Sequence, residues 1–130
     1  MFEKSLKEKF SKIFEIDKVT YDRPSDANEQ ECLWVNLEDS TNRVRKGEFT
    51  AVVRGTAYVM GQSTKIPFGF ISKKIQEADH TDTKDLFFSE IDKNTQVYQN
   101  IVQRSFAFVY FFHGQYDPKV GTINTIDFKE

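Results

Sequence analysis

The hydrophobic pattern of the chain begins with a helical repeat. Lysines, glutamates and serines separate apolar side chains that recur mostly every three or four residues, at Phe2, Leu6, Phe10, Ile13 and Phe14. This spacing places the apolar residues on one stripe of an α-helix. The polar side mixes both charge signs, which favours packing on the protein's own sheet over binding to a membrane. The pattern predicts an amphipathic helix over residues 2–15.

Alternation of apolar and polar residues follows. Val19 and Tyr21 alternate with polar neighbours, and ECLWVNLED places its leucines and Val35 on one face. Both segments are typical of strands. The DSTN that follows has turn-forming residues, so we expect a hairpin into NRVRKGEF. Residues 49–60, FTAVVRGTAYVM, predict a long strand that bends near Gly55, where a bulge or a close backbone contact would suit glycine.

A second helical repeat begins at Pro67, a residue suited to a first helical turn. Apolar residues then recur at helical spacing, at Phe68, Ile71, Ile75 and Ala78. This predicts a helix over residues 67–79. Beyond it we expect a strand in DLFFSEID, a turn in KNTQ, a long strand over residues 97–112 and a short strand in TINTIDF.

This order of elements predicts the fold class. Strands joined by short turns favour an antiparallel sheet, and two helices with one apolar stripe each can cover only one face of it. We therefore predict a single α+β domain over residues 1–130, with a mainly antiparallel β-sheet and two amphipathic helices packed on one face. The predicted core is Phe2, Leu6, Phe10, Phe14, Leu33, Val35, Val53, Phe68, Ile71, Ile75, Phe88, Phe106 and Phe108.

The run RSFAFVYFF, residues 104–112, would be apolar on both faces of a strand beyond Ser105. It is far shorter than the ~20 residues that a membrane-spanning helix needs. Two explanations remain. The sheet curls into a sandwich or half-barrel that buries both faces, or a second subunit covers the face that the helices leave open.

Net charge, cysteine content and the N-terminal segment reduce the number of possible functions. The net charge of -2 gives no basic field that would draw the protein to nucleic acid. Cys32 is the only cysteine, which excludes an internal disulfide and fits a reducing compartment. The charged N-terminus, MFEKSLKEKFSKIF, lacks the apolar stretch of a signal peptide, so we expect the protein to stay where it is made.

Candidate catalytic chemistry is sparse. Asp79, His80 and Asp82 could suggest a metal site, but they follow a predicted helix in a polar segment without a second ligand cluster, which favours a solvated loop. His113 is interpreted as a strand-end histidine. The sequence has no serine elbow, glycine-rich phosphate loop or Cys/His pair. We therefore expect no enzyme activity, cofactor or metal.

One compact basic element remains, formed by Arg43, Arg45 and Lys46 in NRVRKGEF and followed by Glu48. In a strand, Arg43 and Arg45 would point the same way and would suit a phosphate backbone or an acidic neighbouring subunit. A solvated strand edge protected by its charge explains the same residues equally well. These four residues are the candidate contact with a neighbouring subunit.

The chain resembles the tail terminator and tail-completion proteins of long-tailed bacteriophages. The resemblance lies in the Phe-rich first helix, the hairpin ECLWVNLEDSTNRVRKGEFTAVVRGTAYV, the helix IPFGFISKKIQEAD and the strand YQNIVQRSFAFVYFF. The chain departs from the family's pattern in its last segment, DPKVGTINTIDFKE, which is interpreted as an added edge strand or as an arm to a neighbour.

The resemblance implies a structural virion protein without catalytic activity. Such proteins assemble as a hexameric ring on the tail tube, end its growth and join it to the head–tail connector protein. In such a ring, the contact with a subunit or with the tube would fall to Arg43, Arg45, Lys46 and Glu48. It also implies assembly in the host cytoplasm, a final location in the virion tail or neck, no contact with a membrane, and DNA only by passage through the ring lumen. A small-molecule-binding α+β domain and another head–tail connector or neck component remain alternatives.

Overall fold

The computed structural model describes residues 2–23, 31–78, 83–98, 100–117 and 122–124. Its elements are α1 (Phe2–Phe14), β1 (Val19–Thr20), β2 (Cys32–Arg45), β3 (Glu48–Gln62), α2 (Phe70–Glu77), β4 (Leu86–Tyr98), β5 (Ile101–Asp117) and β6 (Thr122–Asn124). The strands form one sheet in the order β1-β2-β3-β5-β4, and β6 pairs with β5. Only β1 runs parallel to its neighbour, β2. The predicted α+β fold with a mainly antiparallel sheet is confirmed.

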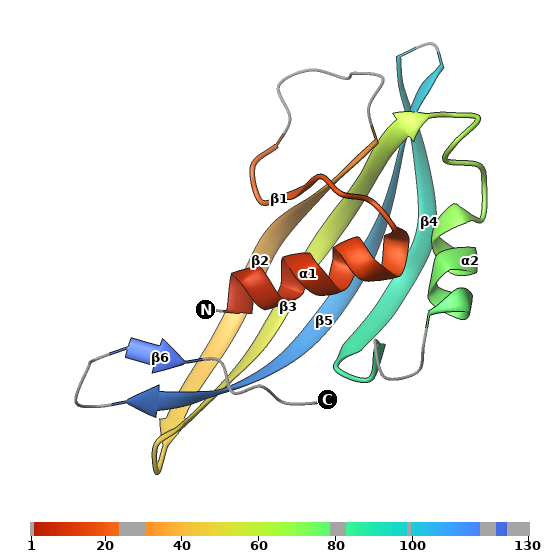
Figure 1. The fold of residues 1–130 in the computed structure, drawn as a ribbon. Helices are drawn as coiled ribbons and strands as arrows, with labels where there is room; N and C mark the ends of the chain where they lie inside the picture. Colours follow the sequence, from red (N-terminus) through yellow and green to blue (C-terminus); the bar gives the residue numbers. More distant parts are fainter. Residues whose placement is uncertain (1, 24–30, 79–82, 99, 118–121, 125–130) are drawn as a thin grey trace.

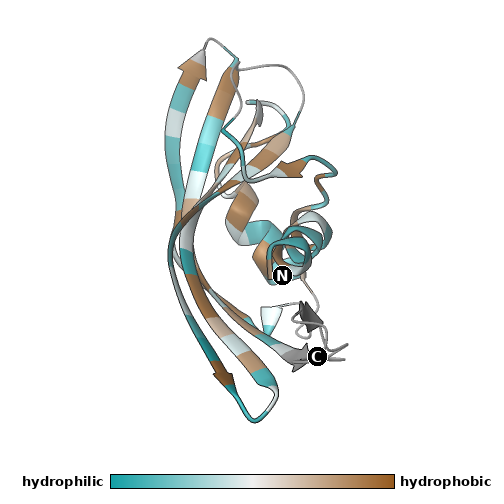
Figure 2. Ribbon diagram, turned by 90° about the vertical axis from the view of Figure 1, so that its left-hand side faces the viewer, coloured by the Kyte–Doolittle hydropathy of each residue, from teal (hydrophilic) through white to brown (hydrophobic). Residues whose placement is uncertain are grey.

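Both helices lie on the same side of the sheet, as predicted. Helix α1 crosses β2, β3 and β5, and α2 lies beside β4 (Figure 1). The sheet curves around the helices (Figure 2). We call the side that faces the helices the inner face and the opposite side the outer face.

The inner face and α1 form the core, which is dominated by phenylalanine. Phe10 packs edge-on against Phe106 and Phe108, with ring centroids 5.8 and 5.1 Å apart. Ten of the thirteen predicted core residues are buried: Phe2, Leu6, Phe10, Phe14, Leu33, Val35, Val53, Ile71, Phe106 and Phe108. Ile75 and Phe88 are partly buried against this core.

Phe68 was wrongly predicted to be a core residue, because its side chain is 81% exposed. The helix that should have turned Phe68 inward begins at Phe70 rather than at Pro67. Gly69 precedes it with φ 86°, a left-handed conformation that glycine adopts without strain. Asp92 of β4 then caps the helix, since its carboxylate accepts hydrogen bonds from the N–H groups of Ile71 and Ser72, both at 3.2 Å.

Two turns were also placed wrongly. The DSTN segment lies within β2, and the chain turns at Lys46 and Gly47 instead. The KNTQ segment lies within β4, where Lys93 to Gln96 pair with β5. In both cases polar residues continue an exposed strand, because the ladder with the neighbouring strand continues past them.

Gly55 has the close contact that the sequence suggested. A Cβ atom there would lie 2.4 Å from the carbonyl oxygen of Asn36 and about 3.0 Å from the Phe108 ring. Gly55 pairs with Leu37, next to a register shift between Leu37 and Asp39. The bulge and the glycine together allow β2 and β3 to follow the curve of the sheet.

Candidate functional site

The outer face of the sheet is the candidate functional surface. No helix or second sheet in the described part of the chain covers this face (Figure 2). The side chains of the apolar run in β5 therefore differ in exposure between the two faces. Phe112 on the inner face is 3% exposed, and Phe111 on the outer face is 38% exposed. The first explanation offered for this run, a sheet closed around both faces, is not what the described residues form.

The sheet brings four apolar residues together on the outer face. The register places Val109 of β5 directly between Arg54 of β3 and Phe87 of β4, and it pairs Phe111 with Val52. Phe87 is 58% exposed and contacts the Phe111 ring edge-on, at 5.5 Å between centroids. We call Val52, Phe87, Val109 and Phe111 the outer patch.

The sequence indicated only part of the outer patch. The run of apolar residues in β5 indicated Val109 and Phe111, but the pairing of β4 with β5 was needed to add Phe87. A second aromatic pair lies further along the same face, where Trp34 and Tyr58 stack with centroids 4.3 Å apart. The indole Nε1 of Trp34 is buried without a hydrogen-bond partner among the described residues.

The four residues predicted as a contact lie at the exposed tip of the β2–β3 hairpin. Arg45 pairs with Glu48 and Arg43 pairs with Thr50, so the two arginines share the outer face, as predicted for a strand. With Glu48 and Thr50 they line a shallow hollow of about 170 Å³. Lys46 lies in the turn, with φ 51°. In the described part of the chain, Arg43 and Arg45 form no ion pair with a carboxylate.

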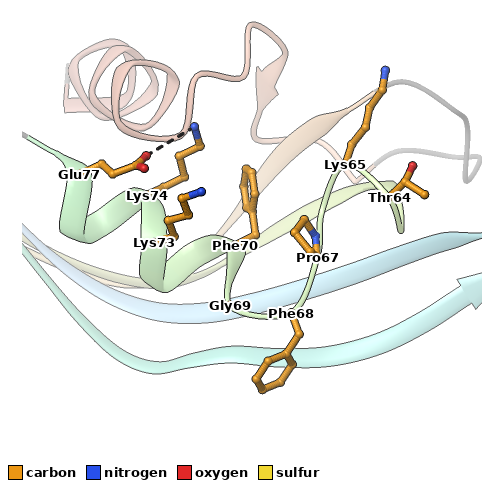
Figure 3. A pocket seen from close by; sticks show the side chains of 9 residues that line it. All are labelled: Thr64, Lys65, Pro67, Phe68, Gly69, Phe70, Lys73, Lys74 and Glu77. Carbon is orange, nitrogen blue, oxygen red and sulfur yellow. Dashed lines mark ion pairs between the residues drawn. The ribbon is translucent and has the colours of Figure 1, made fainter.

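A larger pocket, of about 310 Å³, lies on the helix side of the sheet. It is lined by Thr64, Lys65, Pro67, Phe68, Gly69, Phe70, Lys73, Lys74 and Glu77 (Figure 3). Lys74 forms ion pairs with Glu77, at 3.8 Å, and with Glu15. Phe68 points away from the other side chains that line the pocket (Figure 3). The lining contains no residue of β5, whereas a small-molecule site built on the aromatic strand would use that strand as its wall.

His113 and Cys32 are the candidate chemical groups that the structure describes. His113 lies on the exposed outer face opposite Thr50, and His80 lies outside the described residues. Cys32 is buried, and burial raises the pKa of its thiol. Among the residues that the structure describes, no three His, Cys, Asp or Glu side chains gather as metal ligands, and no helix is long and apolar enough to cross a membrane.

The final segment was expected to form either an added edge strand or an arm. Thr122–Asn124 forms β6, which pairs with residues 115–117 of β5. Residues 118–121 and 125–130 of this segment lie outside the described residues.

Comparison with known proteins adds no family to this description, because no protein-family model and no curated protein sequence matches the chain.

Proposed function

We propose that this protein is a structural subunit that assembles with copies of itself through the outer face of its sheet. The observation that carries the proposal is the outer patch, whose aromatic members Phe87 and Phe111 are exposed beside a packed core that already holds the helices. Aromatic side chains that contact each other and remain in water are typical of the centre of a protein interface.

The particular assembly that we propose is a hexameric ring that caps a bacteriophage tail tube and offers a surface to the head–tail connector. This part rests on the resemblance to tail terminator and tail-completion proteins. A ring requires a heterologous contact that closes on itself, so the outer patch of one subunit would meet a different surface of the next. The proposed location is the virion tail or neck.

Arg43, Arg45, Lys46 and Glu48 are proposed to set the orientation of the neighbouring subunit or of the tube. They lie on the same hairpin and border the outer face without an internal ion pair among the described residues. Exposed charges of this kind influence the choice of partner and the association rate more than they influence affinity. They therefore accompany the apolar contact rather than replace it.

The experiment measures mass by native mass spectrometry and light scattering, with the protein alone and with purified tail tubes. We expect rings, either free or only on tube ends. Phe87→Ser should abolish ring formation and leave the melting temperature nearly unchanged. Phe68→Ser is the matched control, since it removes an exposed phenylalanine that lies outside the outer patch. A strict monomer in both conditions, without binding to tube ends, would overturn the proposal.

The contribution of the charged tip can be measured separately. Arg43→Glu should weaken ring formation and leave the melting temperature unchanged, because an exposed arginine contributes little to the fold. Equal ring formation by Arg43→Glu and the wild type would show that Arg43 is only a solvated charge at the edge of the hairpin.

A further inference from the structure

The two long edges of the sheet differ. On one side, β4 is interrupted by a register shift between Ser89 and Lys93, within which Glu90 and Asp92 have positive φ values of 52° and 64°. Bulges of this kind protect an edge strand from pairing with another chain. Asp92 is also occupied, because it caps α2.

The other edge, β2, has no such protection along its second half. β1 pairs only with Leu33 and Trp34, and no described strand lies beside residues 36–45 on that side. Every residue from Glu38 to Lys46 is exposed. From Asp39 to Arg45 the pairing with β3 has no register shift, so this stretch is a regular strand.

The turn geometry determines which backbone groups face the open edge. Lys46 and Gly47 both have positive φ, as in a type I′ turn, so Arg45 and Glu48 exchange hydrogen bonds across the hairpin. Bonded and non-bonded pairs alternate along an antiparallel ladder. The N–H and C=O groups of Ser40, Asn42 and Val44 therefore point away from β3, toward the open edge.

The side chains along this edge are complementary to a second copy that runs in the opposite direction. Asp39 lies at one end of the regular stretch and Arg45 at the other. A two-fold axis through Asn42 places each Asp39 opposite Arg45 of the second copy. Ser40 then meets Val44 and Asn42 meets Asn42 as the bonded pairs. Asp39 and Arg45 fall in the non-bonded pairs, where facing side chains lie closest.

We propose that residues 39–45 of β2 form a two-fold antiparallel strand pair with the same residues of a second copy, with Asp39 opposite Arg45. A parallel pair would instead place the arginines side by side. A two-fold register centred on Thr41 would extend into the irregularity between Leu37 and Asp39. The contact goes beyond the proposed ring, because it is isologous, uses the strand edge and closes after two copies.

A charge exchange tests the register directly. Asp39→Arg alone places arginine opposite arginine, and Arg45→Asp alone places aspartate opposite aspartate. Each variant should dimerise about tenfold more weakly than the wild type, whereas an equimolar mixture should form heterodimers in which every such pair is complementary. Lys93→Asp on β4 is the control and should dimerise as the wild type does. Sedimentation velocity over a range of concentrations measures the dimerisation of all five samples, the wild type included.

A disulfide cross-link tests whether the two-fold axis passes through Asn42. Asn42→Cys should oxidise to a disulfide-linked dimer, since the Cα atoms of a bonded pair lie ~5.5 Å apart, within the range that a disulfide spans. Thr41→Cys is the matched control, because its two copies would lie roughly 8 Å apart in this register. The native Cys32 is common to both variants, and its buried thiol has a raised pKa that slows its reaction.

The outcomes separate this proposal from the ring. A wild type that stays monomeric at high concentration, a mixture no more dimeric than its components, or faster cross-linking at Thr41→Cys than at Asn42→Cys would each overturn the strand pair. Phe87→Ser should leave the strand pair intact while it abolishes the ring. Asn42→Pro should abolish the strand pair and leave the ring, because it removes an N–H group that β3 does not use.

Discussion

The two faces of the sheet are built from the same strands and even from neighbouring residues of β5, yet their surroundings differ. Phe106, Phe108 and Phe112 on the inner face are buried against α1 and the neighbouring strands, whereas Phe111 on the outer face contacts Phe87 and remains partly in water. Alternation along a strand gives the two faces separate roles. The inner face stabilises the fold, and the outer face is free to bind a partner.

The two faces of the sheet also differ in the surroundings of their arginines. Arg104 on the inner face is 5% exposed, and its Nε donates a hydrogen bond to the carbonyl oxygen of Ile66 at 2.9 Å. Its Nη1 is buried without a partner among the described residues. Arg54 on the outer face is exposed and lies 3.9 Å from Asp39. The same side chain is thus part of the interior on one face and solvated on the other.

The largest expected effect is on the free energy of unfolding when one phenylalanine on each face is replaced by alanine. Phe108→Ala removes a fully buried ring that packs against Phe10, so the free energy of unfolding should fall by about 3–5 kcal/mol. Phe111→Ala, its matched control on the outer face, should lower it by less than about 1 kcal/mol. Urea denaturation measures both free energies of unfolding, and equal slopes of free energy against urea concentration make them comparable. Equal losses would mean that the two faces do not differ in this way.

A smaller effect separates the two arginines. Arg104→Ala leaves the Ile66 carbonyl without its donor, which should lower the free energy of unfolding by about 1–3 kcal/mol. Arg54→Ala removes only an exposed ion pair, so it should change that energy by less than about 0.5 kcal/mol. Thermal unfolding measures both changes in free energy. It is carried out at low and at high salt because salt screens an exposed ion pair. A loss for Arg54→Ala as large as that for Arg104→Ala would contradict the assignment.

The smallest effect concerns the attachment of α2 to the inner side. Asp92→Gly removes the cap of α2 without adding backbone strain, so the free energy of unfolding should fall by about 1 kcal/mol. Glu90→Gly is the control, because Glu90 has a similar positive φ but forms a surface ion pair with Lys93 and does not cap α2. Hydrogen exchange should be faster in α2 for Asp92→Gly alone. Unchanged exchange there would mean that the cap is dispensable.

Much of the fold could be predicted from residue spacing, because that spacing reflects local geometry. The stripe of α1 and the alternation in β2, β3 and β5 each follow from the repeat of one element. The placement of both helices on one face followed from counting apolar stripes. The candidate site was predicted less completely. Arg43 and Arg45 share a face as expected, but Phe87 joins Phe111 only through the pairing of β4 with β5.

The sequence by itself determined which residues can be buried and in what order the elements occur. Only the tertiary structure decided where the hairpins turn, since the ladders of β2 with β3 and of β4 with β5 continue past the polar DSTN and KNTQ segments. It also decided that Phe68 lies in water, because a carboxylate from β4 fixes where α2 begins. The physical reason is that these outcomes depend on pairing between segments far apart in the chain, which local periodicity does not encode.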